Sequence, residues 1–139
     1  MPEPTKLSKD DRLLVQFPLC TIQTSIFELS ERLQIPLASW EDPGMGKANG
    51  FGCRLASGSI VFLEEFDHAR EHLRSGPTIY IEASQLIERG IDVTLSETIA
   101  GLSLPRQCVT WSQTEEGRQA AKQVVQAATE RMAKRENGA

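Results

Sequence analysis

The sequence has few of the residues that mark disulfide-rich, metal-binding or membrane-spanning proteins. Its 139 residues include three cysteines, two histidines, two tryptophans and one tyrosine. No Cys-x-x-Cys motif occurs, which excludes zinc-ribbon and thioredoxin-like proteins. No apolar run approaches the roughly 20 residues of a membrane helix, and the polar N-terminus lacks the apolar core of a signal peptide. We therefore expect a cytoplasmic protein with no membrane partner and no cofactor.

A recognisable nucleophile is also missing. Cys20, Cys53 and Cys108 are far apart in the sequence and lie in apolar segments. Thiols of this kind are typical of small buried hydrophobic residues in a reducing compartment. Cys20 precedes a predicted helix, whose dipole would lower the thiol pKa, yet neither histidine is recognisably paired with it. No Gly-x-Ser-x-Gly elbow occurs, so the sequence does not indicate acyl-transfer or thiol chemistry.

An excess of positive charge is absent as well. Nineteen acidic and 15 basic residues give a net charge of −4. This balance argues against a nucleic-acid partner, because such proteins need a basic face to displace counterions from phosphates. Residues 41–97 hold ten acids and five bases, whereas 118–135 hold five bases and one acid, Glu130. The distribution predicts an acidic face in the middle of the chain and a basic final helix.

The length and composition that are present fit one globular domain. A chain of 139 residues with 40% hydrophobic and 24% charged residues can bury a core without disulfide or metal support. We expect a disordered tail over residues 1–7, a single α+β domain over 8–135 and a frayed C-terminus over 136–139.

Hydrophobic periodicity predicts several helices. The apolar spacing between Thr21 and Ile35 predicts an amphipathic helix that Pro36 ends. Ser112 and Glu115 have the spacing of a capping box and open a final helix of about twenty residues. Its narrow apolar stripe comprises Ala121, Val124, Val125, Ala128 and Met132. Shorter helices are predicted over 68–74, 84–89 and 95–102, and residues 12–17 fit either a helix or a strand.

The strand signals are strongest in a hairpin. Phe51–Leu55 alternates in polarity, Ala56–Ser59 suits a tight turn, and Ile60–Leu63 is continuously apolar. Further strands are predicted over 37–40, 78–81 and 107–111, and Gly44–Gly50 is interpreted as a flexible connection. The predicted fold is therefore α+β: a small, mainly antiparallel sheet of about four or five strands, packed by three or four helices, with a long C-terminal helix.

Two motifs contain residue types that bind ions. His68 and His72 lie four residues apart and, with Glu64 nearby, have the composition of a two-histidine, one-carboxylate metal site. Position 69 is alanine, so the metalloprotease motif His-Glu-x-x-His is absent, and a solvated helix explains the pair more simply. The glycines around Lys47 resemble a phosphate loop, but alanine follows the lysine and a strand follows the loop, contrary to that motif.

The acidic residues of the middle segment lie beside aromatic residues and a methionine. Acids steer a basic partner, and aromatic side chains and methionine supply anchors, although each tryptophan is individually more typical of a core. We interpret a set of eight residues as binding a partner: Trp40, Glu41, Asp42, Met45, Phe51, Glu64, Glu65 and Asp67.

The favoured function is a non-catalytic protein-binding module that occludes a basic site on another protein. In size and charge the chain is similar to small bacterial inhibitors, including toxin-neutralising immunity proteins. This similarity is one of class and involves no specific residue. The alternative is a small metal-dependent or small-molecule enzyme that uses His68, His72 and a nearby glutamate. Self-association through the final helix or a sheet edge is a third possibility.

Overall fold

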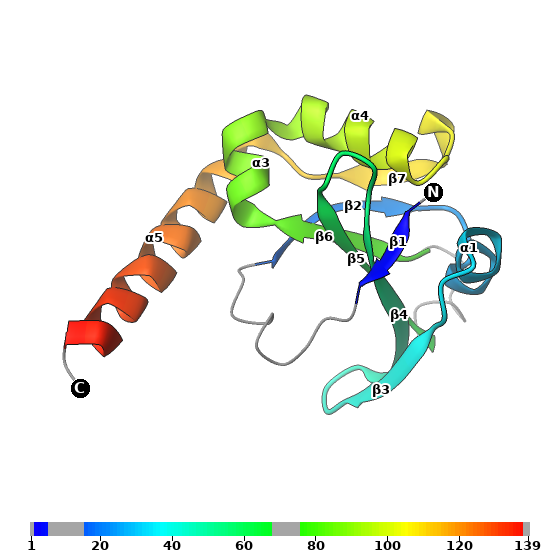
Figure 1. Cartoon of the computed structure of the whole chain (residues 1–139), viewed down its shortest axis with the longest axis horizontal. Coiled ribbons are helices and arrows are strands. Elements are labelled where there is room, and N and C mark those ends of the chain that lie inside the picture. Colours follow the sequence, from blue (N-terminus) through cyan, green and yellow to red (C-terminus); the bar gives the residue numbers. More distant parts are fainter. Residues whose placement is uncertain (1, 6–15, 68–75, 138–139) are drawn as a thin grey trace.

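The computed structural model describes residues 2–5, 16–67 and 76–137. Within these ranges seven strands form one antiparallel sheet, and helices pack on it in an α+β fold (Figure 1). The strand order is β1-β4-β5-β6-β2-β7, and β3 also pairs with β4. The strands are β1 (Glu3–Thr5), β2 (Gln16–Ile22), β3 (Ala38–Asp42), β4 (Gly46–Arg54), β5 (Ile60–Phe66), β6 (Thr78–Glu82) and β7 (Val109–Ser112). The helices are α1 (Ile26–Leu33), α3 (Ala83–Arg89), α4 (Ile91–Gly101), the short η2 (Arg106–Cys108) and α5 (Glu115–Asn137).

The sheet is larger than the four or five strands predicted, mainly because of its first two strands. Glu3–Thr5, which the sequence placed in a disordered tail, pairs with the end of β4. Residues 16 and 17, left open between helix and strand, begin β2, which pairs with both β6 and β7. The helix predicted from Thr21 starts later, at Ile26. Ser25 caps it, and Thr21 and Ile22 belong to strand β2.

The predicted hairpin is confirmed as β4 and β5. Its turn includes Gly58 with φ +93°, a conformation that glycine adopts without steric cost. Strand β4 is longer than expected, so most of Gly44–Gly50 is strand and not a flexible connection. A second hairpin joins β3 to β4, where the Asp42 carboxylate accepts hydrogen bonds from the backbone N–H groups of Gly44 and Met45 at 2.9 and 3.0 Å.

The later elements differ from prediction mostly at their ends. Helix α4 begins at Ile91, before the predicted start at residue 95, so Thr94 is buried inside the helix. The start of α5 is capped by Thr114, whose hydroxyl accepts from Gly117 N–H at 3.0 Å, and not by Ser112. Strand β7 pairs with β2. The predicted helix over 68–74 lies outside the described residues.

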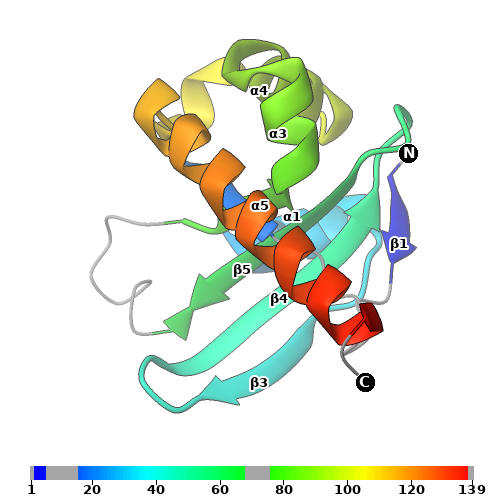
Figure 2. The same cartoon turned by 90° about the vertical axis from the view of Figure 1, so that its left-hand side faces the viewer.

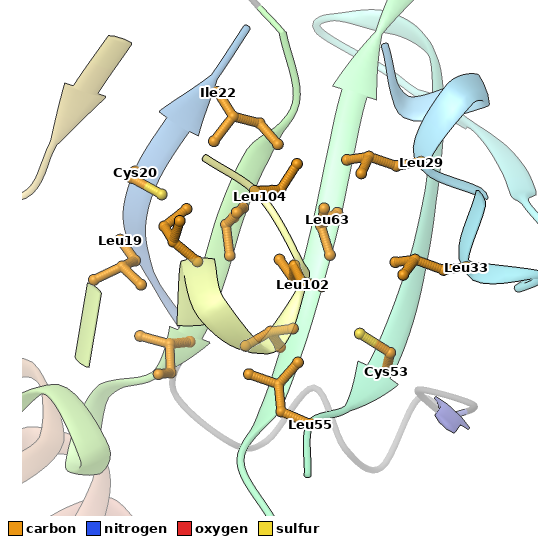
Figure 3. Packing of buried hydrophobic residues seen from close by; sticks show 14 of the residues in the cluster. Leu19, Cys20, Ile22, Leu29, Leu33, Cys53, Leu55, Leu63, Leu102 and Leu104 are labelled. Carbon is orange, nitrogen blue, oxygen red and sulfur yellow. The ribbon is translucent and has the colours of Figure 1, made fainter. Parts of the chain in front are cut away.

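The core lies on one side of the sheet. Figure 3 shows Leu29 and Leu33 of α1 packed beside Cys53 of β4 and Leu63 of β5. The three cysteines form no disulfide, and they are buried, as the sequence predicted. Buried side chains of α3 and α4, including Leu86, join the same cluster.

Helix α5 extends away from the body of the molecule in Figure 1, and in the view of Figure 2 it passes in front of β5 and β4. At its start, the Arg118 guanidinium donates to the carbonyl oxygens of Leu86 and Ile87 in α3, at 3.2 and 2.5 Å. Ala121 is its only buried residue among those described, and Met132 is 56% exposed. The predicted apolar stripe therefore does not cover the core.

The N-terminus of α1 is held by a glutamate from the sheet. Glu65 of β5 is only 4% exposed, and its carboxylate accepts the Ile26 N–H at 3.1 Å. The next N–H, of Phe27, donates to Ser25 Oγ at 3.2 Å. Because helix N-termini favour negative charge and leave N–H groups without intrahelical partners, Glu65 serves to dock α1 on the sheet.

Replacing Glu65 with alanine should lower the free energy of unfolding by about 1–3 kcal/mol, because a buried N–H loses its acceptor. Glu65→Gln, which keeps an oxygen acceptor, should lose less. Urea denaturation followed by circular dichroism measures both. Glu31→Ala, on the exposed side of α1, is the control. Equal losses in all three variants would contradict this role for Glu65.

Candidate functional site: the aromatic–acidic face

The side of the sheet away from the core carries aromatic and acidic side chains from three strands. Alternation along each strand and the strand register put the following five residues on this side: Trp40 and Asp42 of β3, Phe62 and Glu64 of β5, and Tyr80 of β6. We call these five residues the aromatic–acidic face. The buried side chains of α1, α3 and α4 belong to the core on the opposite side.

Three aromatic rings form a continuous band across this face. The ring centroids of Trp40 and Phe62 are 5.8 Å apart, with an angle of 27° between their planes. Those of Phe62 and Tyr80 are 6.2 Å apart at 39°. These separations lie in the range of favourable aromatic pairs. All three residues are half-buried, so the band is packed from below and still offers surface to a partner.

The band depends on a glycine in β4. A Cβ atom at Gly50 would lie 2.8 Å from Cη2 of Trp40 and 2.3 Å from the Leu63 carbonyl oxygen of β5. The absence of a side chain therefore lets the indole lie over β4 and reach Phe62. Gly50 also pairs directly with Glu64 in the register, so the indole lies close to Glu64 as well.

Glu64 is the acidic group most affected by its surroundings. Burial raises its pKa above the usual value of 4.5, a hydrogen bond from Tyr80 lowers it, and the nearby Asp42 charge raises it. The Tyr80 hydroxyl donates to Glu64 Oε1 at 3.4 Å. Burial and the Glu64 charge raise the Tyr80 pKa in turn. The face therefore presents a partly desolvated carboxyl group of raised pKa beside a phenol that is protonated at neutral pH.

The raised pKa gives a prediction for stability. Between pH 4.5 and the higher pKa of folded Glu64, the folded chain binds more protons than the unfolded chain, so this group lowers stability as pH rises through that window. Glu64→Gln removes the effect. The variant should gain stability over wild type at pH 7, and the gain should shrink as pH falls towards 4. Urea denaturation across pH 4–8 measures the difference.

The matched control for this prediction is Glu116→Gln, at an exposed position of α5. Its stability relative to wild type should not follow the same pH dependence. A constant difference between Glu64→Gln and wild type over the whole range would contradict the assignment of a desolvated carboxylate.

The structure separates the eight residues predicted to bind a partner. Trp40, Asp42 and Glu64 lie together on the aromatic–acidic face. Glu41 is exposed on the opposite side of β3, and Met45, 47% exposed, stands at the β3–β4 turn.

The other three predicted residues lie elsewhere. Phe51 and Glu65 are each 4% exposed and belong to the core side, so both are unavailable for surface contact. Asp67 follows β5, and Asn49 Nδ2 donates to its carboxylate at 2.9 Å. That hydrogen bond places Asp67 beside Asn49, whose own side-chain oxygen accepts from Ser39 Oγ at 2.7 Å.

Two members of the face were missed from sequence. Phe62 lies in a continuous apolar run, which does not show which side of the sheet it faces. In the structure β5 alternates, and only its odd-numbered residues from Val61 to Glu65 reach the core. Tyr80 is the sole tyrosine and lies in a strand rich in β-branched residues. Tyr80 lies two residues from Thr78 and from Glu82, and residues two apart in a strand lie on the same side of the sheet. These two polar neighbours were the signal that Tyr80 faces outward.

The described residues do not supply an evident catalytic nucleophile or metal site. Burial raises the thiol pKa of Cys20 and of Cys53 to about 12, so both stay protonated at neutral pH. Cys20 lies within β2 and not before a helix, which removes the predicted dipole effect. No cluster of three or more potential metal ligands occurs among the described residues. His68 and His72 lie outside them, and the metal alternative stays a prediction.

A groove of about 560 Å³ lies where α3 and α4 meet the start of α5. It is lined in part by Arg89 and Glu115. Arg89 forms an ion pair with Glu97, and hydrogen bonds from Gln119 and Arg118 lower the pKa of Glu115. Because Arg89 and Glu115 already have partners here, we place the candidate site on the aromatic–acidic face.

Comparisons with protein-family models, with curated proteins and with solved structures found no match for this chain. In the described parts of the chain, no helix combines the length and the apolar character that crossing a membrane requires.

Proposed function

We propose that the protein is a non-catalytic protein-binding module whose aromatic–acidic face contacts a basic surface of another protein. The observation that supports this most is the band of Trp40, Phe62 and Tyr80, with Glu64 beside it on the same side of the sheet. The mode of action is that of an inhibitor of the immunity-protein kind. Its acids take the place of a phosphate or nucleic-acid substrate in a basic active site and occlude that site.

Binding energetics favour this face over the other exposed positions. Tryptophan and tyrosine are enriched among interface residues that dominate affinity, and half-buried rings lose little conformational freedom on binding. The acidic groups increase the association rate with a basic partner and disfavour acidic ones. Met45 at the hairpin tip and Glu41 on the far side of β3 would contribute at the rim.

The partner is first captured from an extract of the source cells and identified by mass spectrometry. The purified partner is then titrated with the wild-type protein and with variants to measure affinity. Asp42→Lys/Glu64→Lys should weaken binding at least ~100-fold, because each reversal places like charges against a basic site. Glu116→Lys/Glu130→Lys, which makes the same charge change on exposed α5 positions, should alter affinity by less than ~3-fold. Circular dichroism verifies that both variants are folded.

Equal affinities of the two double variants for the purified partner would move the interface away from this face and contradict the proposal. A partner whose enzymatic activity continues unchanged in the saturated complex would contradict the occlusion mechanism.

A further inference from the structure

Among the residues that the structure describes, no cation is paired with Glu64 of the aromatic–acidic face. Among the described residues, the Tyr80 hydroxyl is the hydrogen-bond donor to Glu64 and no ion pair includes this glutamate. Glu64 is half-buried and faces Gly50 across the β4–β5 register. A partly desolvated carboxylate with free acceptor positions is a favourable site for a charge-assisted hydrogen bond from a cation.

Aromatic rings lie on the same side as this carboxylate. Trp40 lies over Gly50, the residue paired with Glu64, and continues the band to Phe62 and Tyr80. The face of an aromatic ring attracts a cation within about 6 Å of its centroid, most strongly for tryptophan. The carboxylate and the rings together therefore define a place where a positive group gains from both contacts.

We propose that this face binds an arginine side chain of the partner, with its guanidinium stacked on the aromatic band and hydrogen-bonded to Glu64. The proposal rests on the proposed function and specifies its central contact. Arginine fits better than lysine because its guanidinium is planar, more weakly hydrated and able to donate two hydrogen bonds to one carboxylate while stacking on a ring. Charge complementarity with Asp42 and Glu64 selects a cation over a neutral planar group.

The test titrates the protein with three capped tripeptides, acetyl-Gly-X-Gly-amide, in which X is arginine, lysine or citrulline. Citrulline keeps the shape of arginine and removes its charge. The readout is the NMR shift of the two indole N–H groups. Trp111 serves as an internal reference because it lies on β7, at the far edge of the sheet from β3. We expect a saturable shift of Trp40 alone, with a dissociation constant on the order of 10 mM for so small a probe.

The arginine peptide should bind ~3-fold or more tightly than the lysine peptide and ~10-fold or more tightly than the citrulline peptide. Glu64→Gln should weaken arginine binding ~5-fold or more, whereas Glu116→Gln should not change it. Binding should also weaken as pH falls and Glu64 takes up a proton. Equal affinities for arginine and citrulline, or an unchanged affinity in Glu64→Gln, would overturn the proposal.

The two proposals fail separately. If Asp42→Lys/Glu64→Lys loses the purified partner while the arginine and citrulline peptides bind equally, the arginine contact is wrong and the protein-binding function stands. If neither the partner nor the peptides depend on this face, both proposals are wrong.

Discussion

Gly50→Ala should destabilise the protein by about 3 kcal/mol, the upper part of the range for overpacking in a well-packed region. The added Cβ would lie 2.3 Å from the Leu63 carbonyl oxygen, which is backbone, and 2.8 Å from the Trp40 ring. Neither neighbour can yield cheaply, because the first belongs to the adjacent strand and the second is held against Phe62. Urea denaturation monitored by circular dichroism measures the loss.

Gly44→Ala is the matched control for this substitution. A Cβ at Gly44 would meet Asp42 Oδ1 at 3.6 Å, an ordinary van der Waals contact. Its stability should stay within about 0.5 kcal/mol of wild type. If Gly50→Ala were as stable as Gly44→Ala, β4 would not approach β5 and Trp40 as closely as described, and the aromatic band would lose its structural basis.

Leu63→Ala should lower the free energy of unfolding by about 2–5 kcal/mol. Leu63 is fully buried in β5, between β4 and β6 and facing α1 (Figure 3). Truncation removes apolar contacts and leaves a cavity that the surrounding strands and helix close only in part. Thermal and urea denaturation measure the effect, and the cooperativity of the transition reports whether the core stays uniquely packed.

Val93→Ala provides the comparison for Leu63→Ala. Val93 is 50% exposed on α4, and alanine is a better helix former than valine, so stability should change by less than about 0.5 kcal/mol. A loss in Leu63→Ala no larger than in Val93→Ala would contradict the placement of β5 at the centre of the core.

Local sequence patterns identified the elements whose signals are contained within a few residues. The β4–β5 hairpin followed from alternation, a glycine turn and an apolar strand, and β6 from its β-branched residues. Strand β1 has three residues and no pattern of its own, so only its pairing with β4 reveals it. Strand β2 contains Pro18, which normally argues against an inner strand, and the register shift next to that proline accommodates it.

The eight residues grouped from the sequence lie on different sides of the sheet, and strand alternation is the main reason. Glu64 and Glu65 are adjacent in a strand, so their side chains point to opposite sides of the sheet. The sequence grouped both in one acidic cluster, whereas the structure uses Glu65 to cap α1 and leaves Glu64 on the aromatic–acidic face. Tyr80 is 16 residues away from Glu64 in the sequence and lies on the next strand, β6. Only the register of β5 with β6 brings the two side chains together.

Features that would support the proposed binding also oppose stability. A half-buried carboxylate with a raised pKa lowers stability at neutral pH, and the same desolvation strengthens a hydrogen bond to an incoming cation. We therefore expect Glu64→Gln to be more stable than wild type and weaker in binding. Such opposite effects are characteristic of functional positions.

Hydroxyl-radical footprinting of the complex with the identified partner tests the central claim most directly. Trp40 and Tyr80 belong to the aromatic–acidic face, and Trp111, 43% exposed on β7, is a reference of the same chemistry outside it. We predict that the partner lowers the oxidation rates of Trp40 and Tyr80 severalfold and leaves that of Trp111 unchanged. Unchanged oxidation of Trp40 and Tyr80 in a saturated complex would contradict the account.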